Sequence, residues 1–572
     1  MKAFLLIVST SLFSVVVFCQ AITWSPDVIM PKETETNSML TFPGSDANNY
    51  YVNESVNGTR LIKRKWKDFV ATVNKASLKV IRQKDLTGEL PDDGKDYLNA
   101  RNFIYQDKQY NFFIDMKDQK QYQVYSVIQD MNGTASSIKA IQKVDIQSYA
   151  VFKSAASVIK HKTSNRTEAV IASTYVNFKP AYDQKSILSA LVYEKVDDNY
   201  SMLNVSEWDE NLKATVSINY KIPFLAKQYK EKTIFGEAGT NDGEQPEILD
   251  YAKDNNGFVY VLIQSADPKD KDEANLFWLY QFKLSDPSFV KVYKKEIGKN
   301  RTSVQASLFQ DQSGKTFVSA IGLEIEDDKD KRDRHSVNSA FVVSFNNEGN
   351  LVNIFSGRLK TEMMYNFVKE KHVDKYGYIN SLRIKNILPA ADGGCFVIWQ
   401  HEWIEMKTNN VSSNNSITHY YYHSDNALVQ YYNKANKMAW EKPIYKEQKT
   451  NDKIANIYSD LASGILNNVL YVFYPDDPKN ADKPVDEKEV GEYNVVRFAN
   501  KDLAGMFVAK FDTKGNYTRQ YVKWPEDKIG FALCSNSFEY IGNNEVIATV
   551  RKIRQGALFL KSEEYTFFKL KF

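Results

Sequence analysis

The sequence is poor in cysteine, histidine, glycine and proline, and it carries almost no net charge. Its 572 residues include three Cys, six His, 24 Gly and 15 Pro. Three cysteines exclude a disulfide-dense scaffold and an all-cysteine zinc site, which needs four thiolates. With 74 Lys plus Arg against 71 Asp plus Glu, the net charge of +3 argues against a nucleic-acid-binding protein. Beyond residue 18 no apolar run is long enough to predict a membrane-spanning helix.

Motifs of common catalytic and cofactor sites are also missing from the sequence. It has no Gly-Lys-Ser/Thr phosphate loop, no Gly-x-Gly-x-x-Gly after a strand and no Gly-x-Ser-x-Gly elbow. His419 and His423 would share a strand face but lie roughly 13 Å apart, too far to bind one zinc ion. We therefore predict no catalytic residues, no metal and no cofactor.

The first 21 residues are typical of a signal peptide. Lys2 gives a positive start, residues 3–18 are largely apolar, and Cys19 and Ala21 are small residues at the spacing that a signal peptidase accepts. An uncleaved membrane anchor is the alternative, although an apolar run of about sixteen residues is short for a span. We predict an exported protein, periplasmic, cell-surface or secreted, whose residues 22–572 form a single soluble domain and a monomer.

Two cysteines, Cys395 and Cys534, remain after signal cleavage. Each lies in an apolar run, where free cysteine behaves as a small buried hydrophobe. An oxidising compartment would also allow a disulfide between them. We favour two buried, unpaired thiols.

Aromatic and β-branched residues are abundant, with 33 Phe and 35 Tyr, and they recur in short runs rather than at helical spacing. One kind of segment is a tight turn followed by a continuous apolar run, as a strand buried on both faces requires. The clearest runs are 258–263, 395–399, 469–473 and 546–550. Weaker copies follow Asn49, Gln109, Thr167 and Gly314.

The second kind of segment is a strand, a polar turn and another strand. Residues 340–354 show it clearly, with the turn Asn346-Asn347-Glu348-Gly349 between two apolar stretches. Gly, Asn and Asp supply the backbone conformations that such hairpins need. The other turns are expected near Asn74, Asn132, Asp197, Ser285, Asn433, Asp512 and Ser562.

The two kinds of segment alternate eight times, at spacings of about 50 to 90 residues, which is typical of β-propeller blades. We therefore predict an all-β fold, a β-propeller with eight blades favoured over seven. The segment Trp24 to Pro31 is then available to add a strand to the last blade and close the ring. The alternatives are a pair of β-sandwiches, for which no linker is evident, and a β-solenoid, whose coils are shorter and more uniform.

Residues 428–440, Leu-Val-Gln-Tyr-Tyr-Asn-Lys-Ala-Asn-Lys-Met-Ala-Trp, resemble the blade motif of quinoprotein-like propellers, in which a turn residue and Lys precede a Trp. Asn436 stands where that motif has Gly, the other units do not keep the Trp, and no adjacent cysteine pair is present. The resemblance implies a propeller, often of eight blades, whose cofactor-free relatives act as scaffolds in bacterial envelopes. It does not imply binding of pyrroloquinoline quinone here.

A cluster of aromatic and imidazole side chains is the candidate binding site. In extended strands, Trp399, His401 and Trp403 would share one face, and so would His419, Tyr421 and His423. Two such strands would form a stacking platform with hydrogen-bonding groups, suited to a sugar ring or another flat polar ligand. Packing of these side chains between blades is the alternative.

We predict an exported binding or scaffolding protein whose partner is an envelope or extracellular protein or a glycan. One alternative is a glycoside hydrolase, or another hydrolase, that uses acidic residues near the propeller axis. Another is an outer-membrane β-barrel, because residues 564–572 end on an aromatic with apolar residues alternating on one face. The hairpins are short for a barrel wall, and we expect Phe572 to pack in the closing blade.

Overall fold

This computed structural model describes the chain in separate segments, most of which are strands. The described residues are 21–27, 38–57, 66–85, 97–115, 121–130, 134–145, 178–181, 185–197, 200–222, 247–254, 256–266, 275–298, 301–310, 316–325, 336–345, 351–376, 379–380, 382–412, 415–435, 437–451, 461–483, 485, 496–497, 505–540, 545–555 and 561–571.

Hydrogen bonding joins the strands of this part of the chain into eight sheets, each built around four strands, which follow in chain order except that β1 is the fourth strand of the last sheet. Neighbouring strands run antiparallel, except that β27 and β30 pair in parallel. The first four sheets are β2 (Ser38–Ser45), β3 (Asn49–Asn57), β4 (Trp66–Asn74) and β5 (Val80–Asp85); β6 (Tyr97–Tyr105), β7 (Lys108–Asp115), β8 (Gln121–Asp130) and β9 (Lys139–Asp145); β10 (Phe178–Pro180), β11 (Ile187–Asp197), β12 (Tyr200–Trp208) and β13 (Ala214–Ile222); and β14 (Glu247–Lys253), β15 (Phe258–Ala266), β16 (Asn275–Lys283) and β17 (Asp286–Gly298).

The last four sheets include the larger ones. They are β18 (Arg301–Gln310), β19 (Thr316–Ile325), β20 (Ser336–Phe345) and β21 (Leu351–Arg358), with β22 (Ile379–Asn380) on β20; β23 (Leu382–Pro389), β24 (Cys395–Ser412), β25 (Asn415–Tyr432) and β26 (Met438–Ile444), with β27 (Gln448–Asn451) and β30 (Val496–Arg497); β28 (Ala462–Leu466), β29 (Val469–Tyr474), β31 (Gly505–Asp512) and β32 (Tyr517–Lys523); and β33 (Ala532–Tyr540), β34 (Glu545–Gln555), β35 (Lys561–Lys571) and β1 (Ala21–Trp24). The helices are α3 (Thr361–Met364), α4 (Glu370–Tyr376) and the 3-10 turns η3 (Pro478–Asn480) and η4 (Glu526–Lys528).

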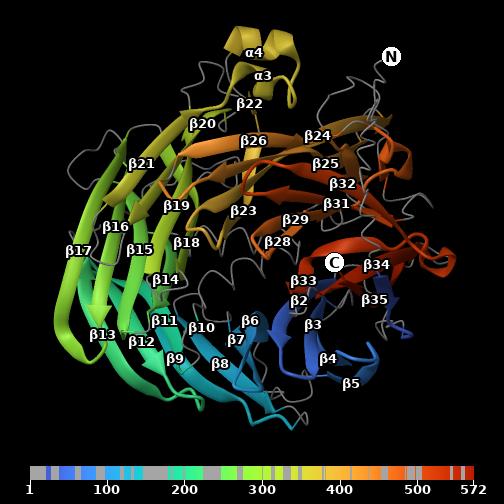
Figure 1. The fold of residues 1–572 in the computed structure, drawn as a ribbon. Coiled ribbons are helices and arrows are strands. Elements are labelled where there is room, and N and C mark those ends of the chain that lie inside the picture. Colours follow the sequence, from blue (N-terminus) through green and yellow to red (C-terminus); the bar gives the residue numbers. More distant parts are fainter. Residues whose placement is uncertain are drawn as a thin grey trace, which may run out of the picture.

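The sheets follow one another around a centre, from the blue sheet of β2 to the red sheet of β33 (Figure 1). Neighbouring sheets meet largely through their first strands: β2 contacts β6, β6 contacts β10, β14 contacts β18, and β18 contacts β23. The series continues from β23 to β28 and from β28 to β33. A last contact joins β33 to β2, so the eighth sheet lies against the first.

The second strand of each clear unit is buried on both faces, as its continuous apolar run predicts. In β15, the residues Val259 to Ile263 are at most 1% exposed, and residues 470, 472, 473 and 474 of β29 are fully buried. Because both faces are covered, each sheet needs a neighbour on either side. The predicted strands after Gln109, Gly257, Gly314, Gly394, Asn468 and Asn544 are confirmed as β7, β15, β19, β24, β29 and β34.

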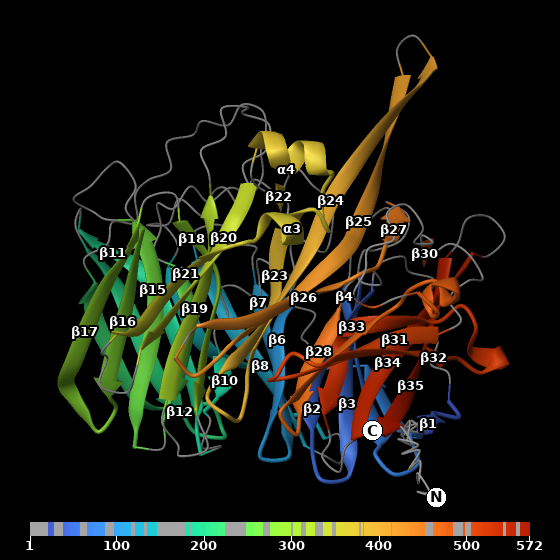
Figure 2. The ribbon, with the colours of Figure 1, turned by 45° about the horizontal axis from the view of Figure 1, so that its top comes forward.

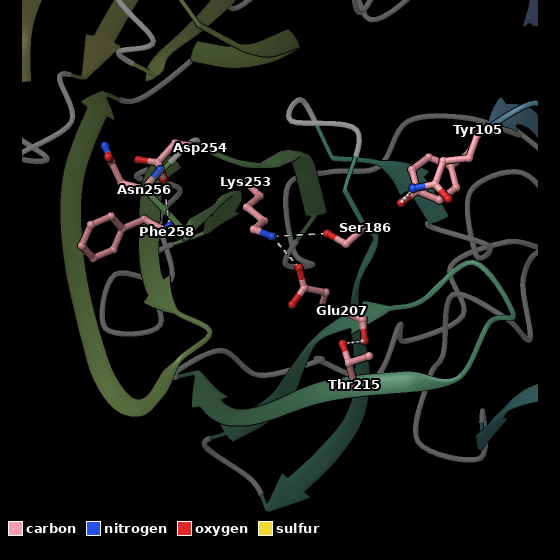
Figure 3. A network of polar contacts seen from close by, with 9 residues as sticks. Tyr105, Ser186, Glu207, Thr215, Lys253, Asp254, Asn256 and Phe258 are labelled. Atoms are coloured by element: carbon pink, nitrogen blue, oxygen red, sulfur yellow. Dashed lines mark hydrogen bonds and ion pairs between the residues drawn. The ribbon is translucent and has the colours of Figure 1, made fainter. Parts of the chain in front are cut away.

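Polar contacts also join adjacent sheets. Lys253, at the end of β14, lies 2.5 Å from Glu207 Oε1 on β12 and 3.3 Å from Ser186 Oγ before β11 (Figure 3). Trp440, the tryptophan of the quinoprotein-like motif, donates from Nε1 to the carbonyl of Thr513 in the next sheet, at 3.1 Å. The motif residue therefore fastens one sheet to the hairpin turn of its neighbour.

The third and eighth sheets differ from the prediction. The run expected after Thr167 lies outside the described residues, and the turn near Asp197 joins β11 to β12 instead of closing the sheet. The closing hairpin turns instead at Asp209 to Leu212. In the eighth sheet, Ser562 lies inside β35, and the fourth strand is β1, which begins at Ala21 rather than at Trp24.

Both cysteines after the predicted signal peptide, Cys395 and Cys534, are buried, and no disulfide joins them. Burial raises the pKa of the Cys395 thiol to about 12, so it stays protonated at neutral pH. The predicted packing of Phe572 falls outside the described residues; Phe568 and Leu570 of β35 are fully buried. None of the helices that the structure describes is long and apolar enough to cross a membrane.

Candidate functional site

The candidate site lies on the hairpin formed by β24 and β25, which are 18 residues each. The two strands pair from Cys395 and Tyr432 at the base to Ser412 and Asn415 at the far end. The base is buried in the sheet, and the far half projects beyond the other sheets (Figure 2). A register irregularity at His401 marks the transition between the two halves.

Trp399 belongs to the buried half. It is 1% exposed and packs with Leu428 and Tyr432, and its indole Nε1 donates to Gln430 Oε1 at 2.8 Å. A ring enclosed in this way offers no face to a ligand, so Trp399 acts in the core. Sequence analysis left packing in the core as the alternative to a binding role, and the burial of Trp399 agrees with that alternative.

Trp403 and His423 form a stacked pair across the two strands. They are register partners, their ring centroids are 3.7 Å apart, and their planes differ by 10°. The indole Nε1 of Trp403 donates to Asp425 Oδ2 at 2.7 Å, which fixes the ring in its plane. Trp403 nevertheless remains 36% exposed, whereas His423 is buried. The pair therefore presents an indole to solvent with an imidazole beneath it.

His401 lies between the buried and the projecting halves. It is 8% exposed, its Nδ1 is 3.7 Å from Asp425 Oδ2, and its ring meets Phe367 edge to face at 6.5 Å. Asp425 thus contacts both His401 and Trp403. The side chain of His419 lies outside the described residues, but its backbone pairs with Lys407.

Two lysines converge on Glu405. Its Oε1 is 3.0 Å from Lys407 Nζ and its Oε2 is 2.8 Å from Lys449 Nζ. Both ammonium groups also lie over the ring of Tyr421, at 5.2 and 4.6 Å from its centroid. Lys449 reaches the site because β27 pairs with β25. We call Trp403, Glu405, Lys407, Tyr421, His423 and Lys449 the hairpin platform.

The protonation states of the platform follow from these contacts. Hydrogen bonds from Lys449 and Lys407 lower the pKa of Glu405 to about 2, so it is ionised at neutral pH. Burial lowers the pKa of His423, and this effect outweighs the attraction of Asp425 and Glu405 for the charged form. At neutral pH the platform therefore carries two ammonium groups, one carboxylate and a neutral imidazole.

A buried polar cluster lies beneath the platform. Lys446 is 1% exposed and donates from Nζ to the carbonyl of Ser424, at 2.8 Å, and to Gln448 Oε1, at 2.9 Å. Gln448 donates in turn to the carbonyl of Pro475 in the next sheet. Asp476 follows Pro475 and is also 1% exposed. These contacts anchor the base of β27, the strand that carries Lys449.

The structure brings Trp403 and His423 together and places Tyr421 beside the same lysines; the sequence reasoning did not include Asp425, Glu405 and Lys407. Alternation along the two strands is the signal that could have found Glu405 and Lys407, since they follow Trp403 at every second position. Lys449 gives no such signal, because it comes from a separate strand. Among the residues that the structure places, no group of three or more His, Cys, Asp or Glu could hold a metal ion.

Carboxylates are also paired with lysines, in one case between two sheets and in another within one sheet. Lys179 Nζ of β10 lies 2.6 Å from Asp250 Oδ1 of β14, and Lys385 Nζ of β23 lies 2.7 Å from Glu402 Oε1 of β24. Burial nevertheless lowers the pKa of Lys179. Such pairs tie strands together, which is a structural task.

No protein-family model and no curated protein matches the sequence. Solved structures that resemble the fold include the β-propeller domain of the Trilobed protease from Pyrococcus furiosus, with 8% identity, a TM-score of 0.33 and coverage of 84% of this chain and 97% of that one. A Synechocystis apocarotenoid oxygenase has 6% identity, a TM-score of 0.29 and coverage of 73% and 91%. A GH43_1 enzyme from Xanthomonas citri has 10% identity, a TM-score of 0.25 and coverage of 51% and 84%. At TM-scores this low, the likenesses carry no argument about this chain.

Proposed function

We propose that the chain is an eight-bladed β-propeller whose ring is closed by β1. The support is the series of contacts from sheet to sheet, which returns from β33 to β2. The pairing of β1 with β35 supplies the last sheet with its fourth strand. A fourth strand taken from the other end of the chain joins the two ends of a ring without an exposed sheet edge.

The protein is exported, and it works as a binding protein. The apolar run of residues 3–18 supports export, and cleavage after Ala21 would leave Ile22 to Trp24 in place to pair with β35. A rigid ring that carries one long projecting hairpin is suited to presenting a contact surface. The carboxylates that the structure pairs with lysines, Asp250 and Glu402, favour this function over hydrolysis by paired acids.

The observation that carries the proposal is the stacked Trp403–His423 pair on the projecting half of the hairpin. An exposed indole that is fixed by Asp425 loses little side-chain freedom on binding, which makes it a good anchor. Its flat apolar face suits the C–H face of a sugar ring, while Glu405 and the lysines can bind hydroxyl groups. We therefore propose a glycan as ligand, ahead of a protein partner.

Titration of a sugar panel tests this function. The chain expressed without its first 20 residues is mixed with xylotriose, cellotriose, chitotriose and trigalacturonate, and binding is followed by tryptophan fluorescence and calorimetry. At least one probe should bind with a Kd below about 1 mM, and Trp403→Ala should weaken it about tenfold. Val292→Ala removes an exposed residue on β17 and is the matched control, with no expected effect.

The proposal is wrong if no sugar of the panel binds. It is also wrong if Trp403→Ala binds as tightly as the unchanged protein, because the indole would then not be the anchor. Circular dichroism of both variants checks that the fold is kept.

A further inference from the structure

Charge is distributed unevenly over the hairpin platform. Lys407 and Lys449 lie at one end with a single carboxylate, that of Glu405, between them. The carboxylate of Asp425 lies at the other end, where it accepts the indole N–H of Trp403. The two lysines and Glu405 together carry a net charge of +1, and Glu405 Oε2 also lies 3.4 Å from Nε2 of His423 in the stacked pair.

Glu405 holds the two ammonium groups in place, and its single negative charge neutralises only one of their two positive charges. Each lysine uses one contact to a different oxygen of Glu405, and an ammonium group has three donors. The side chain of Lys407 is 52% exposed and that of Lys449 is 27% exposed, so both can reach a ligand. Because both also lie over Tyr421, their positions are limited to the space above one ring.

The distance between the two ends fits two neighbouring units of a sugar chain. Trp403, His423 and Lys449 form one row across β24, β25 and β27. Neighbouring strands lie about 4.8 Å apart, so the backbones of Trp403 and Lys449 are separated by about 10 Å. A lysine side chain spans part of that distance. Because His423 covers the Trp403 face on its side of the row, a sugar ring stacks on the opposite face, and an adjoining unit that extends back along the row approaches the ammonium groups.

We propose, building on the function proposed above, that the ligand is an anionic oligosaccharide: one ring stacks on Trp403, and a carboxylate or sulfate of an adjoining unit binds Lys407 and Lys449. Carboxylate and sulfate share the chemistry that recognises an ammonium pair. Glu447, close to Asp425 and Lys449, adds a carboxylate beside this site; burial and then the charge of Asp425 raise its pKa, whereas the charge of Lys449 lowers it.

Matched pairs of sugars that differ in charge test the proposal. Trigalacturonate is compared with its full methyl ester, and a sulfated carrageenan tetrasaccharide with its desulfated form. We expect the charged member of at least one pair to bind about tenfold more tightly than its neutral partner at low salt. Raising the salt concentration from about 20 to about 200 mM should weaken binding of the charged sugar and leave binding of the neutral sugar unchanged.

Lysine variants then locate the anion. Lys407→Gln and Lys449→Gln should each lower the affinity for the charged sugar about fivefold and leave the affinity for the neutral analogue unchanged. Trp403→Ala should lower the affinity for both sugars. Lys407 projects from the far half of the hairpin, so its variant is expected to fold normally even if Lys449→Gln does not. Lys294→Gln, on β17 in another sheet, is the matched control.

The outcomes separate this inference from the function on which it rests. If charged and neutral sugars bind equally and the lysine variants change nothing, the anion site is wrong while binding through Trp403 stands. If neither member of either pair binds but another sugar of the panel does, the anion site is wrong and the function stands. If no sugar of the panel binds either, or Trp403→Ala has no effect, both proposals are wrong. A preference for carboxylate over sulfate, or the reverse, identifies the source of the negative charge.

Discussion

Burial changes the acid–base chemistry of Asp476, the residue that begins the buried turn after β29. Its Oδ1 accepts from Asn480 Nδ2 and from the backbone N–H of Asp477, at 2.9 and 2.8 Å. Its Oδ2 has no hydrogen-bond partner among the residues described around it. Burial therefore raises the pKa of Asp476 to about 7, despite these bonds and the nearby Lys446.

This shift makes part of the stability depend on pH. The folded protein keeps the proton of Asp476 up to about pH 7, whereas the unfolded chain loses it near the ordinary pKa of 3.8. The contribution is therefore fully present below that ordinary value and is lost as pH rises through the folded pKa, by at most about 1.4 kcal/mol per pH unit.

Asp476→Asn, which has no proton to lose, isolates this effect. The free energy of unfolding of the variant minus that of the unchanged protein should increase from pH 5 to pH 7 and level off above pH 7. Urea denaturation of both proteins at four pH values between 5 and 8 measures it. Two curves that stay parallel over this range would show that Asp476 does not titrate there.

At the scale of elements, two glycines that precede buried strands serve different purposes. Gly257 has a φ of +81° and open space around the position of a Cβ, so it is needed for its backbone conformation. At Gly394 a Cβ would lie 2.5 Å from the carbonyl oxygen of Tyr432 and would also meet the Tyr431 side chain. Gly394 is therefore needed because the next strand lies so close.

Substitutions should separate these two requirements. Gly257→Ala should cost about 1 kcal/mol of stability, and Gly257→Asn should recover most of it, because Asn tolerates positive φ. Gly394→Ala and Gly394→Asn should both cost about 2 kcal/mol or more, because any side chain collides with β25. Chemical denaturation measures all four variants. Recovery by Asn at position 394 would contradict the steric explanation.

The sequence predicts elements well where a turn carries a residue with a known preference. Gly257 and Gly394 marked the starts of β15 and β24 correctly, although the sequence could not tell that the two glycines have different roles. The closing turn of the third sheet was missed because Leu212 occupies the positive-φ position, at 56°, where glycine would have signalled a turn. The turn is held instead by Asp209 Oδ1, which accepts from the backbone of Asn211 and Lys213.

The candidate site was predictable to the extent that it follows strand alternation. Trp403 and His423 face each other because every second residue of a strand lies on the same side. The burial of Trp399 depends on where the hairpin leaves the sheet, and that depends on the neighbouring blades. Lys449 joins the platform through the pairing of β27 with β25, and a contact between separate strands leaves no periodic pattern in the sequence.

At the scale of the whole molecule, the segment from β1 to Asp27 joins three sheets. Trp24 meets Trp524 edge to face at 5.0 Å and contacts Phe568 at 5.4 Å, which links the seventh and eighth sheets. Ser25 Oγ donates to the carbonyl of Leu78 at 2.6 Å, and Asp27 Oδ2 accepts from the backbone N–H of Val80 at 2.7 Å, which links them to the first.

If β1 closes a ring as proposed, the fold should lose stability when that junction is weakened. Trp24→Ala removes the ring contacts to Trp524 beside the seventh sheet and to Phe568 in the eighth, and we expect it to cost about 2–3 kcal/mol, less than a fully buried tryptophan because Trp24 is partly exposed. Thr23→Ala, one residue earlier in β1 and exposed, is the matched control and should change stability by at most about 0.5 kcal/mol. Thermal and urea unfolding measure both variants. If β1 closes the ring as proposed, loosening it by Trp24→Ala should also speed hydrogen exchange in β35, and in β5 through Ser25 and Asp27, more than in β15. Equal exchange in all three strands would mean that β1 does not close the ring.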